Sequence, residues 1–283
     1  MVDLDLNRSE LEALLAEDAP WGDLTTAGLG LGHRPARIDF FARADLVVAG
    51  IRIARGLVEV AGGDAEVLVA DGDPVPRGTP LLSARGPAGA LHRAWKQAQT
   101  TLEILSGIAS AAHALVEAAA RGGRVVPVAC TRKTLAGARR LQIGAIVAGG
   151  CIPHRLGLSE TVLVFEEHRR FLPDVPLAEM AARLRRVAPE KKLVIEVASP
   201  EEAASAAAAG FDVIQLEKFA PAEIARTVAL LADRHPRPVL AAAGGIGPDN
   251  AAAHVAAGAD MIVTSWPYGA RPRDVQVRLT PDD

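Results

Sequence analysis

The sequence is poor in cysteine and in aromatic residues. Its 283 residues include two cysteines, Cys130 and Cys151, and only 4% are aromatic. Two cysteines without a CxxC spacing are too few for a disulfide framework or a zinc site, so we expect two reduced core residues. The first twenty residues are acidic and lack the apolar core of a signal peptide. No run approaches 18 uninterrupted apolar residues. These absences predict a cytoplasmic protein that does not span a membrane.

An excess of positive charge is also lacking. Lysine and arginine number 31 against 34 acidic residues, for a formal net charge of −3. This balance argues against a nucleic-acid-binding protein that relies on bulk charge, although it leaves room for a local basic pocket. Hydrophobic residues make up 49% of the chain, which excludes wholesale disorder. The length suits two domains or one barrel.

The first part of the chain, to about residue 105, has the pattern of a separate domain. A helix is predicted over 8–17, with Asn7 as its cap. Runs that alternate apolar and polar residues follow, broken by glycine and proline as antiparallel strands are. A long helical pattern then covers 89–121. We assign 1–105 to this domain and expect 267–283, which contains the strand-like DVQVRL, to return to it.

The remainder, 106–266, alternates short apolar runs with helical patterns. The predicted strands are continuous and apolar, which indicates parallel strands covered on both faces. Five or six such units in a row, without a GxGxxG fingerprint after the first strand, favour a barrel over an open sheet. The strands are expected at 124–130, 160–165, 192–197, 212–216, 238–244 and 260–265, and the helices at 134–148, 200–209, 221–234 and 248–257.

Charged residues follow several of these strands. Catalytic groups of βα barrels gather at the C-terminal ends of strands, so these side chains are expected to share one mouth. Arg132 and Lys133 come directly after an apolar strand, between two threonines, which favours a binding role over an ordinary solvated pair. Arginine offers a bidentate fork to carboxylate or phosphate, and lysine adds a point charge. The full set comprises the cations Arg132, Lys133, His154 and Arg155, the carboxylates Glu196 and Glu217, and Lys218.

Alternatives remain for several of these residues. His154 and Arg155 lie between GGCIP and LGLSE, which is unlike a helix face and favours function. Glu196 would be costly to bury unpaired, so it is either a functional carboxylate or a structural partner of an arginine. Glu217 and Lys218 are equally compatible with a surface ion pair.

The glycine-rich segment AGGIGPDN at 243–250 predicts a phosphate site. Glycine lets the backbone approach a ligand closely, and the next helix would present its N-terminal amides. The last two βα loops of a barrel are where a phosphate is expected. The alternative is that these glycines only form tight turns. The threonine and serine that follow the next strand, Thr264 and Ser265, favour a phosphate site instead. The residues concerned are Gly244, Gly245, Thr264 and Ser265.

Taken together, these motifs resemble the quinolinate phosphoribosyltransferases, also called nicotinate-nucleotide pyrophosphorylases (carboxylating). The resemblance follows the family's order along nearly the whole chain. Some segments, such as PHRLGLSETVLVF and TSWPYGARPRDVQV, look most like the ModD branch of the family, whose genes are associated with molybdenum transport. The matching segments are EDAPWGDLTT (17–26), LSGIAS (105–110), TRKT (131–134), AGGCIPHRLGLSETVLV (148–164), IEVASPEEA (195–203), DVIQLEKF (212–219), AAGGIGPDN (242–250) and GADMIVTS (258–265).

The resemblance implies an N-terminal α/β sandwich, an open TIM-like α/β barrel, and a homodimer, or a higher oligomer built from it, with shared active sites. It also implies a Mg²⁺-dependent reaction of quinolinate with phosphoribosyl pyrophosphate that yields nicotinate mononucleotide, pyrophosphate and carbon dioxide. Carried over residue by residue, Lys133, Glu196 and Glu217 are catalytic, and Glu196 and Glu217 hold the metal. Substrate binding falls to Lys96, Arg132, Lys133, His154, Arg155 and Lys218, and phosphate binding to Gly244, Gly245, Thr264 and Ser265.

Some positions depart from the family pattern. Phe165 replaces a lysine of the pocket, and Lys96 stands where the family has an arginine from the partner subunit. Glu217 and Lys218 replace an aspartate and the asparagine after it, and Ser265 replaces a glycine. Phe165 removes a charge that would meet the anionic ligands, and Lys218 is a candidate to restore it. The altered pocket leaves the identity of the acceptor open.

Three functions therefore compete. The first is phosphoribosyl transfer to quinolinate or another small anionic ring. The second is an accessory protein of molybdenum metabolism that binds an anion without catalysis. The third is a Schiff-base lyase with Lys133 as the amine, which ranks last because Lys133 lies beside Arg132 in an anion-binding motif.

Overall fold

The structure is a computed structural model that describes residues 5–282. It divides into two compact units. The first takes the described chain up to residue 113, together with 135–150 and the segment from 268 onward, and the second takes 114–134 and 151–267. Helix α4 (Ala88–Ala120) contributes to both. Among the described residues, α4 alone is long and apolar enough to cross a membrane by length and composition. Of its most apolar window, 56% is buried, as in the core helix of a soluble protein.

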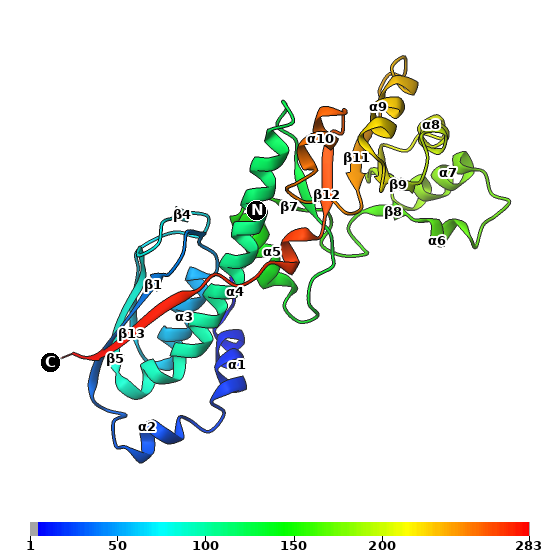
Figure 1. Cartoon of the computed structure of the whole chain (residues 1–283). Coiled ribbons are helices and arrows are strands. Elements are labelled where there is room, and N and C mark those ends of the chain that lie inside the picture. Colours follow the sequence, from blue (N-terminus) through cyan, green and yellow to red (C-terminus); the bar gives the residue numbers. More distant parts are fainter. Residues whose placement is uncertain (1–4, 283) are drawn as a thin grey trace. The chain divides into compact units, whose positions relative to one another are not determined.

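The first unit is built on an antiparallel sheet of four strands, in the order β13-β1-β5-β3 (Figure 1). Every second residue of β1 is buried, so one face of the sheet carries the core, including Ile38 and Phe40. Helix α3 (Ile51–Ala61) contacts β3 and β5. The C-terminal strand pairs with β1 along its length. The strands are β1 (Pro35–Ala42), β3 (Asp64–Val67), β5 (Pro80–Pro87) and β13 (Val275–Pro281), and a separate pair joins β2 (Leu46–Val47) to β4 (Pro74–Val75).

Helix α1 (Arg8–Asp18) confirms the predicted N-terminal helix and its cap. The Asn7 side chain accepts a hydrogen bond from the Glu10 amide, and the Glu10 carboxylate accepts one from the Asn7 amide. This reciprocal arrangement satisfies two donors at the helix start. At the start of the short helix α2 (Leu24–Gly28), the Asp23 side chain accepts from the Thr25 and Thr26 amides, and α5 (Arg139–Ala148) completes the helices of this unit.

The second unit contains a parallel sheet of seven strands in the order β7-β6-β12-β11-β10-β9-β8, curled into a half-barrel. The order ends at β7 and β8, so the barrel is open, as predicted. Because all strands are parallel, their carboxyl ends lie at one edge of the sheet. The strands are β6 (Val128–Cys130), β7 (Ile152–Pro153), β8 (Val162–Val164), β9 (Leu193–Val197), β10 (Val213–Glu217), β11 (Val239–Ala243) and β12 (Met261–Thr264).

The helices of the second unit follow these strands. Helices α7 and α8 contact β9, and α8 also contacts β10. Figure 1 shows α7, α8 and α9 gathered beyond β8, β9 and β11. The helices are α6 (Glu166–Arg169), α7 (Leu177–Val187), α8 (Pro200–Ala208), α9 (Pro221–Leu230) and α10 (Ala251–Ala256), with a 3₁₀ turn, η1 (Trp266–Gly269).

Three predicted elements begin three or more residues later than the sequence pattern suggested. The strand expected from 124 begins at Val128, after Pro127, which has no amide donor for a ladder. The helix expected from 134 begins at Arg139, after Gly137 in a left-handed conformation. The helix expected from 248 begins at Ala251, because Asn250 Oδ1 accepts from the Gly247 amide and forms a turn there. Both cysteines are buried and neither forms a disulfide, as predicted.

Candidate active site

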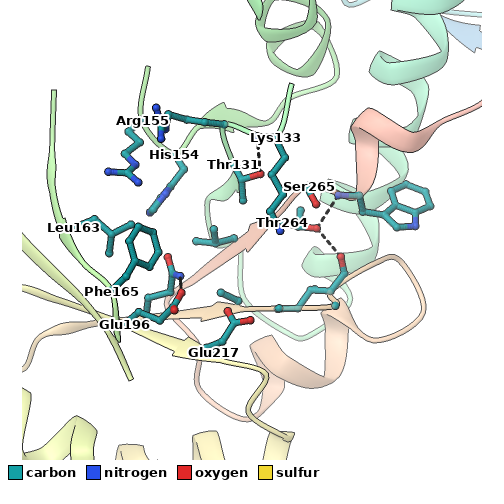
Figure 2. A pocket seen from close by; sticks show the side chains of 18 of the residues that line it. Thr131, Lys133, His154, Arg155, Leu163, Phe165, Glu196, Glu217, Thr264 and Ser265 are labelled. Carbon is teal, nitrogen blue, oxygen red and sulfur yellow. Dashed lines mark hydrogen bonds between the residues drawn. The ribbon is translucent and has the colours of Figure 1, made fainter. Parts of the chain in front are cut away.

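A cavity of about 720 Å³ lies at the carboxyl ends of the parallel strands in the second unit (Figure 2). All the predicted site residues except Lys96 and Lys218 line it, although they come from six segments of the sequence. The lining residues that were predicted are Arg132, Lys133, His154, Arg155, Glu196, Glu217, Gly244, Gly245, Thr264 and Ser265.

The cationic side of the cavity is formed by the loops after β6 and β7. These strands are neighbours, and the His154 amide donates to the Cys130 carbonyl at 2.8 Å. Arg155 is buried, and its guanidinium lies 5.5 Å from the centre of the Phe165 ring. Burial and the charge of Arg132 lower the pKa of Arg155. Among the ion pairs of the described chain, none joins Arg132 or Arg155 to a carboxylate. Two guanidinium groups without a counter-charge make a ready site for an anion.

His154 and Lys133 differ from the arginines. Burial, and then the charge of Arg155, lower the pKa of His154, so its neutral imidazole is favoured at neutral pH. His154 is therefore suited to donate or accept a hydrogen bond rather than to act as a cation. The Lys133 side chain extends toward Thr264 and Ser265 in Figure 2, away from Arg155. Its ammonium thus serves the end of the cavity where the phosphate is expected.

Two carboxylates lie across the cavity, Glu196 on β9 and Glu217 at the end of β10. Burial raises the pKa of Glu196, and the charge of Glu217 raises it further. Gln215, the register partner of Glu196, donates from Nε2 to Glu196 Oε2 at 2.5 Å and opposes this shift. The Gln215 Oε1 atom is itself buried and has no hydrogen-bond partner.

The glycine loop after β11 brings backbone close to the carboxylates. Gly244 and Gly245 have φ angles of +87° and +70°, which glycine adopts without strain. A Cβ atom on Gly244 would lie 2.6 Å from Lys218 Cγ and 2.8 Å from Glu217 Oε1. Gly245 has open space at the same position. Gly245 therefore leaves its backbone uncovered, as a phosphate site requires, whereas Gly244 allows the loop to pack closely against Glu217 and Lys218.

Thr264 holds this loop in place. Its hydroxyl donates to the Ile246 carbonyl at 2.7 Å and accepts from the Trp266 amide at 3.0 Å (Figure 2). The residue is buried, and the hydroxyl proton is already used. The Thr264 hydroxyl thus positions the loop, and the phosphate-binding roles of Thr264 and Ser265 stay predictions.

The two predicted residues outside the cavity lining have other surroundings. Lys218 is exposed, has a φ of +59°, and donates from its backbone amide to the Ala243 carbonyl at 2.7 Å. Lys96, on α4 of the first unit, donates to Gln99 Oε1 at 3.0 Å and lies 4.8 Å from the centre of the Trp95 ring. Their substrate-binding roles stay predictions, that of Lys96 because it concerns the site of a second copy.

Nine lining residues were not among the predicted site residues, and the polar or large ones among them include Thr131, Gln215 and Trp266. A signal existed for Gln215, because it is the polar residue within the apolar strand DVIQL. Trp266 follows Ser265 directly, and its ring lies against Gly247, where a Cβ would be 3.2 Å from Trp266 Cδ1. Nothing in the local pattern distinguished this exposed tryptophan from an ordinary surface residue.

The donor set of the cavity fits Mg²⁺ held partly by a ligand. Residues 5–282 contain no group of three or more His, Cys, Asp or Glu side chains arranged to hold a metal. Magnesium, however, is usually bound by one or two carboxylates together with substrate phosphates and water. Glu196 and Glu217, which line the same cavity as the glycine loop, supply that number of carboxylates.

Comparisons with known proteins cover nearly all of the chain. The family model described as quinolinate phosphoribosyl transferase, C-terminal domain, matches residues 108–278, and the N-terminal domain model matches 23–106. A ModD protein of Rhodobacter capsulatus is 45% identical over 247 residues, which is 87% of this chain and 95% of the relative. The human nicotinate-nucleotide pyrophosphorylase (carboxylating) is 34% identical over 242 residues, or 85% and 80% of the two chains.

Solved structures match over the same extent. The structure of NadC from Streptococcus pyogenes has a TM-score of 0.89 and 28% identity, and the match covers 99% of each chain. The nicotinate-nucleotide pyrophosphorylase of Francisella tularensis has a TM-score of 0.90 at 22% identity and covers 99% of this chain and 98% of that one. The second match supports the fold alone.

Proposed function

The chain belongs to the quinolinate phosphoribosyltransferase family, and we propose that it transfers a phosphoribosyl group from phosphoribosyl pyrophosphate to quinolinate or a related small anionic ring. One observation carries this proposal. A single cavity joins an arginine pair without counter-charge, two carboxylates and a glycine loop with exposed backbone. These are the parts needed to hold an anionic acceptor, the ribose and a phosphate.

In this reaction the acceptor ring nitrogen forms a bond to C1′ of the ribose, and the bond from C1′ to the pyrophosphate oxygen breaks. With quinolinate, loss of the 2-carboxylate as carbon dioxide follows, and a proton takes its place on the ring. Arg132 and Arg155 hold the carboxylates of the acceptor, and Gly244, Gly245 and Ser265 hold the 5′-phosphate. Catalysis then consists of positioning and of electrostatic stabilisation of positive charge at C1′ by Glu196 and Glu217.

Magnesium would neutralise the pyrophosphate as it departs. We assign its protein ligands to Glu196 and Glu217, which belong to strands of the sheet, whereas the third lining carboxylate, Glu167, belongs to the short helix α6. Lys133, whose ammonium lies at the end of the cavity near Ser265, adds positive charge for the 5′-phosphate.

A Mg²⁺-dependent assay with phosphoribosyl pyrophosphate and quinolinate tests the proposal, with nicotinate mononucleotide and pyrophosphate as the measured products. Product formation that Lys133→Ala abolishes is the expected result. Binding of phosphoribosyl pyrophosphate without product would mean that the donor site is retained and the acceptor is different. Absence of binding by both compounds would overturn the proposal.

The second candidate, an accessory anion-binding protein without catalysis, rests on Phe165. Its apolar ring lies in the cavity at the position where the family pattern has a lysine. Calorimetry with molybdate and with phosphoribosyl pyrophosphate separates the two candidates, because only the enzyme needs the donor. If the missing lysine limits quinolinate use, Phe165→Lys is expected to increase it.

The homodimer implied by the resemblance is part of the proposal. In it, Lys96 of one copy would act at the site of the other. Mixing a Lys96→Ala variant with a Lys133→Ala variant tests this role, since only shared sites would regain activity in the mixture.

A further inference from the structure

A second cavity of about 600 Å³ adjoins the candidate active site within the same unit. The two cavities share four lining residues: Arg132, Arg155, Leu163 and Phe165. Leu163 belongs to β8, which is the last strand of the sheet, and Phe165 follows that strand. The second cavity therefore begins where the active-site cavity meets the open edge of the half-barrel.

The walls of the two cavities differ in chemistry. The first contains carboxylates and the glycine loop, whereas the second is lined mainly by aliphatic side chains. Besides the shared arginines it contains His168, whose Nδ1 accepts from the Phe165 amide at 3.0 Å, and Arg183, which is already paired with Glu179 at 2.5 Å. Besides the shared Leu163, the apolar non-aromatic residues come from the loop after β7, from β8, from the segment before α7 and from α7, and are Leu158, Val162, Val164, Leu172, Met180 and Leu184.

Phe165 forms a flat aromatic surface at the junction. Its ring stacks on His168 with 5.9 Å between ring centres and an interplanar angle of 14°. The Arg155 guanidinium lies 5.5 Å from the ring centre. Figure 2 shows the ring beside Leu163 and between Arg155 and Glu196. A planar ligand whose carboxylates reach the arginines would thus have an aromatic neighbour and an aliphatic space beyond it.

We propose that the acceptor of this protein is an aromatic carboxylate larger than a single six-membered ring, with its additional ring in the second cavity. This inference rests on the proposed function, since it assigns the acceptor carboxylates to Arg132 and Arg155. The absence of a lysine at position 165 then has a reason, because a charged side chain at the junction would oppose the entry of an apolar ring.

Two compounds that differ only by a fused benzene ring test the proposal. The first is pyridine-2,3-dicarboxylate, which is quinolinate itself, and the second is quinoline-2,3-dicarboxylate. Both carry the same two carboxylates and the same ring nitrogen. Calorimetry on the full chain is expected to show at least about tenfold tighter binding of the quinoline compound, because its extra ring leaves water for an aliphatic cavity. Equal binding, or tighter binding of the pyridine compound, would overturn this inference and leave the proposed function intact. If neither compound binds, both fail.

A substitution on α7 tests whether the additional ring of the ligand binds in the second cavity. Leu184→Trp fills the second cavity and is expected to remove the preference for the quinoline compound. Val187→Trp, on the same helix, is the matched control, because Val187 is 86% exposed and lies outside the cavity lining. If Leu184→Trp does not fold, Leu172→Trp fills the cavity from the segment before α7. A preference that survives a folded cavity-filling variant would contradict the proposed position of the ring.

Discussion

Gln215 and Glu196 are register partners on neighbouring strands, and the amide of one donates to the carboxylate of the other at 2.5 Å. Gln215 is buried, and Glu196 is half-buried. Burial and the charge of Glu217 raise the pKa of Glu196, and the hydrogen bond from Gln215 is the contact that favours its ionised form. In the proposed function an ionised Glu196 stabilises positive charge on the ribose, and we therefore propose that Gln215 is a positioning residue for Glu196.

Gln215→Met removes this donor at similar volume. Without the hydrogen bond from Gln215, the pKa of Glu196 should rise further. The acid limb of the pH profile of kcat/KM should therefore move to higher pH. The same substitution at exposed Gln276 on β13 serves as control and should leave the profile in place. A loss of activity with an unshifted acid limb would show that Gln215 supports only the local structure.

Glu196→Gln keeps the shape of the side chain and removes its charge. We expect kcat to fall by about 10²-fold or more, as when other preorganised electrostatic groups are removed, with little change in affinity for pyridine-2,3-dicarboxylate. A parallel loss of affinity and rate would instead place Glu196 in acceptor binding.

The same substitution has a consequence for stability. A raised pKa means that the folded state binds more protons than the unfolded state between the ordinary and the raised pKa of Glu196. Wild-type stability therefore falls as pH rises through that window. Glu196→Gln should lack this fall and should melt at a higher temperature than wild type above the window. Thermal unfolding over a pH series measures the difference.

Arg132→Lys and Arg155→Lys retain charge but lose the bidentate fork. A hydrogen bond to a charged group contributes about 1.5–3 kcal/mol, so each variant should bind pyridine-2,3-dicarboxylate roughly ten- to a hundredfold more weakly. Arg170→Lys is the matched control, since Arg170 is exposed and pairs with Glu166 on the short helix α6. Equal effects of all three variants in calorimetry would indicate a general charge effect rather than a specific site.

Sequence patterns predicted the parts of the fold that depend on local chemistry. The Asn7 cap, the apolar strand DVIQL and the gathering of Arg132 and Glu196 at strand ends all follow from spacing and residue type. The late start of α10 was missed because it depends on one hydrogen bond, between Asn250 and the Gly247 amide. The second cavity was also missed, because it arises from side chains of separate elements, and periodicity does not report how they pack.

Gly244 and Gly245 form a matched pair for testing the phosphate loop. Both have positive φ angles, so an alanine at either position costs about 1–2 kcal/mol of backbone strain. At Gly244 the new methyl would also meet Glu217 Oε1 and the Lys218 amide at 2.8 and 2.9 Å, whereas at Gly245 it would meet nothing within 4 Å. Gly244→Ala should therefore lose binding of phosphoribosyl pyrophosphate in calorimetry. Gly245→Ala should lose a similar amount of stability from strain but retain more of the binding. If both variants bind the donor equally, the close approach of the loop to Glu217 has no part in holding the phosphate.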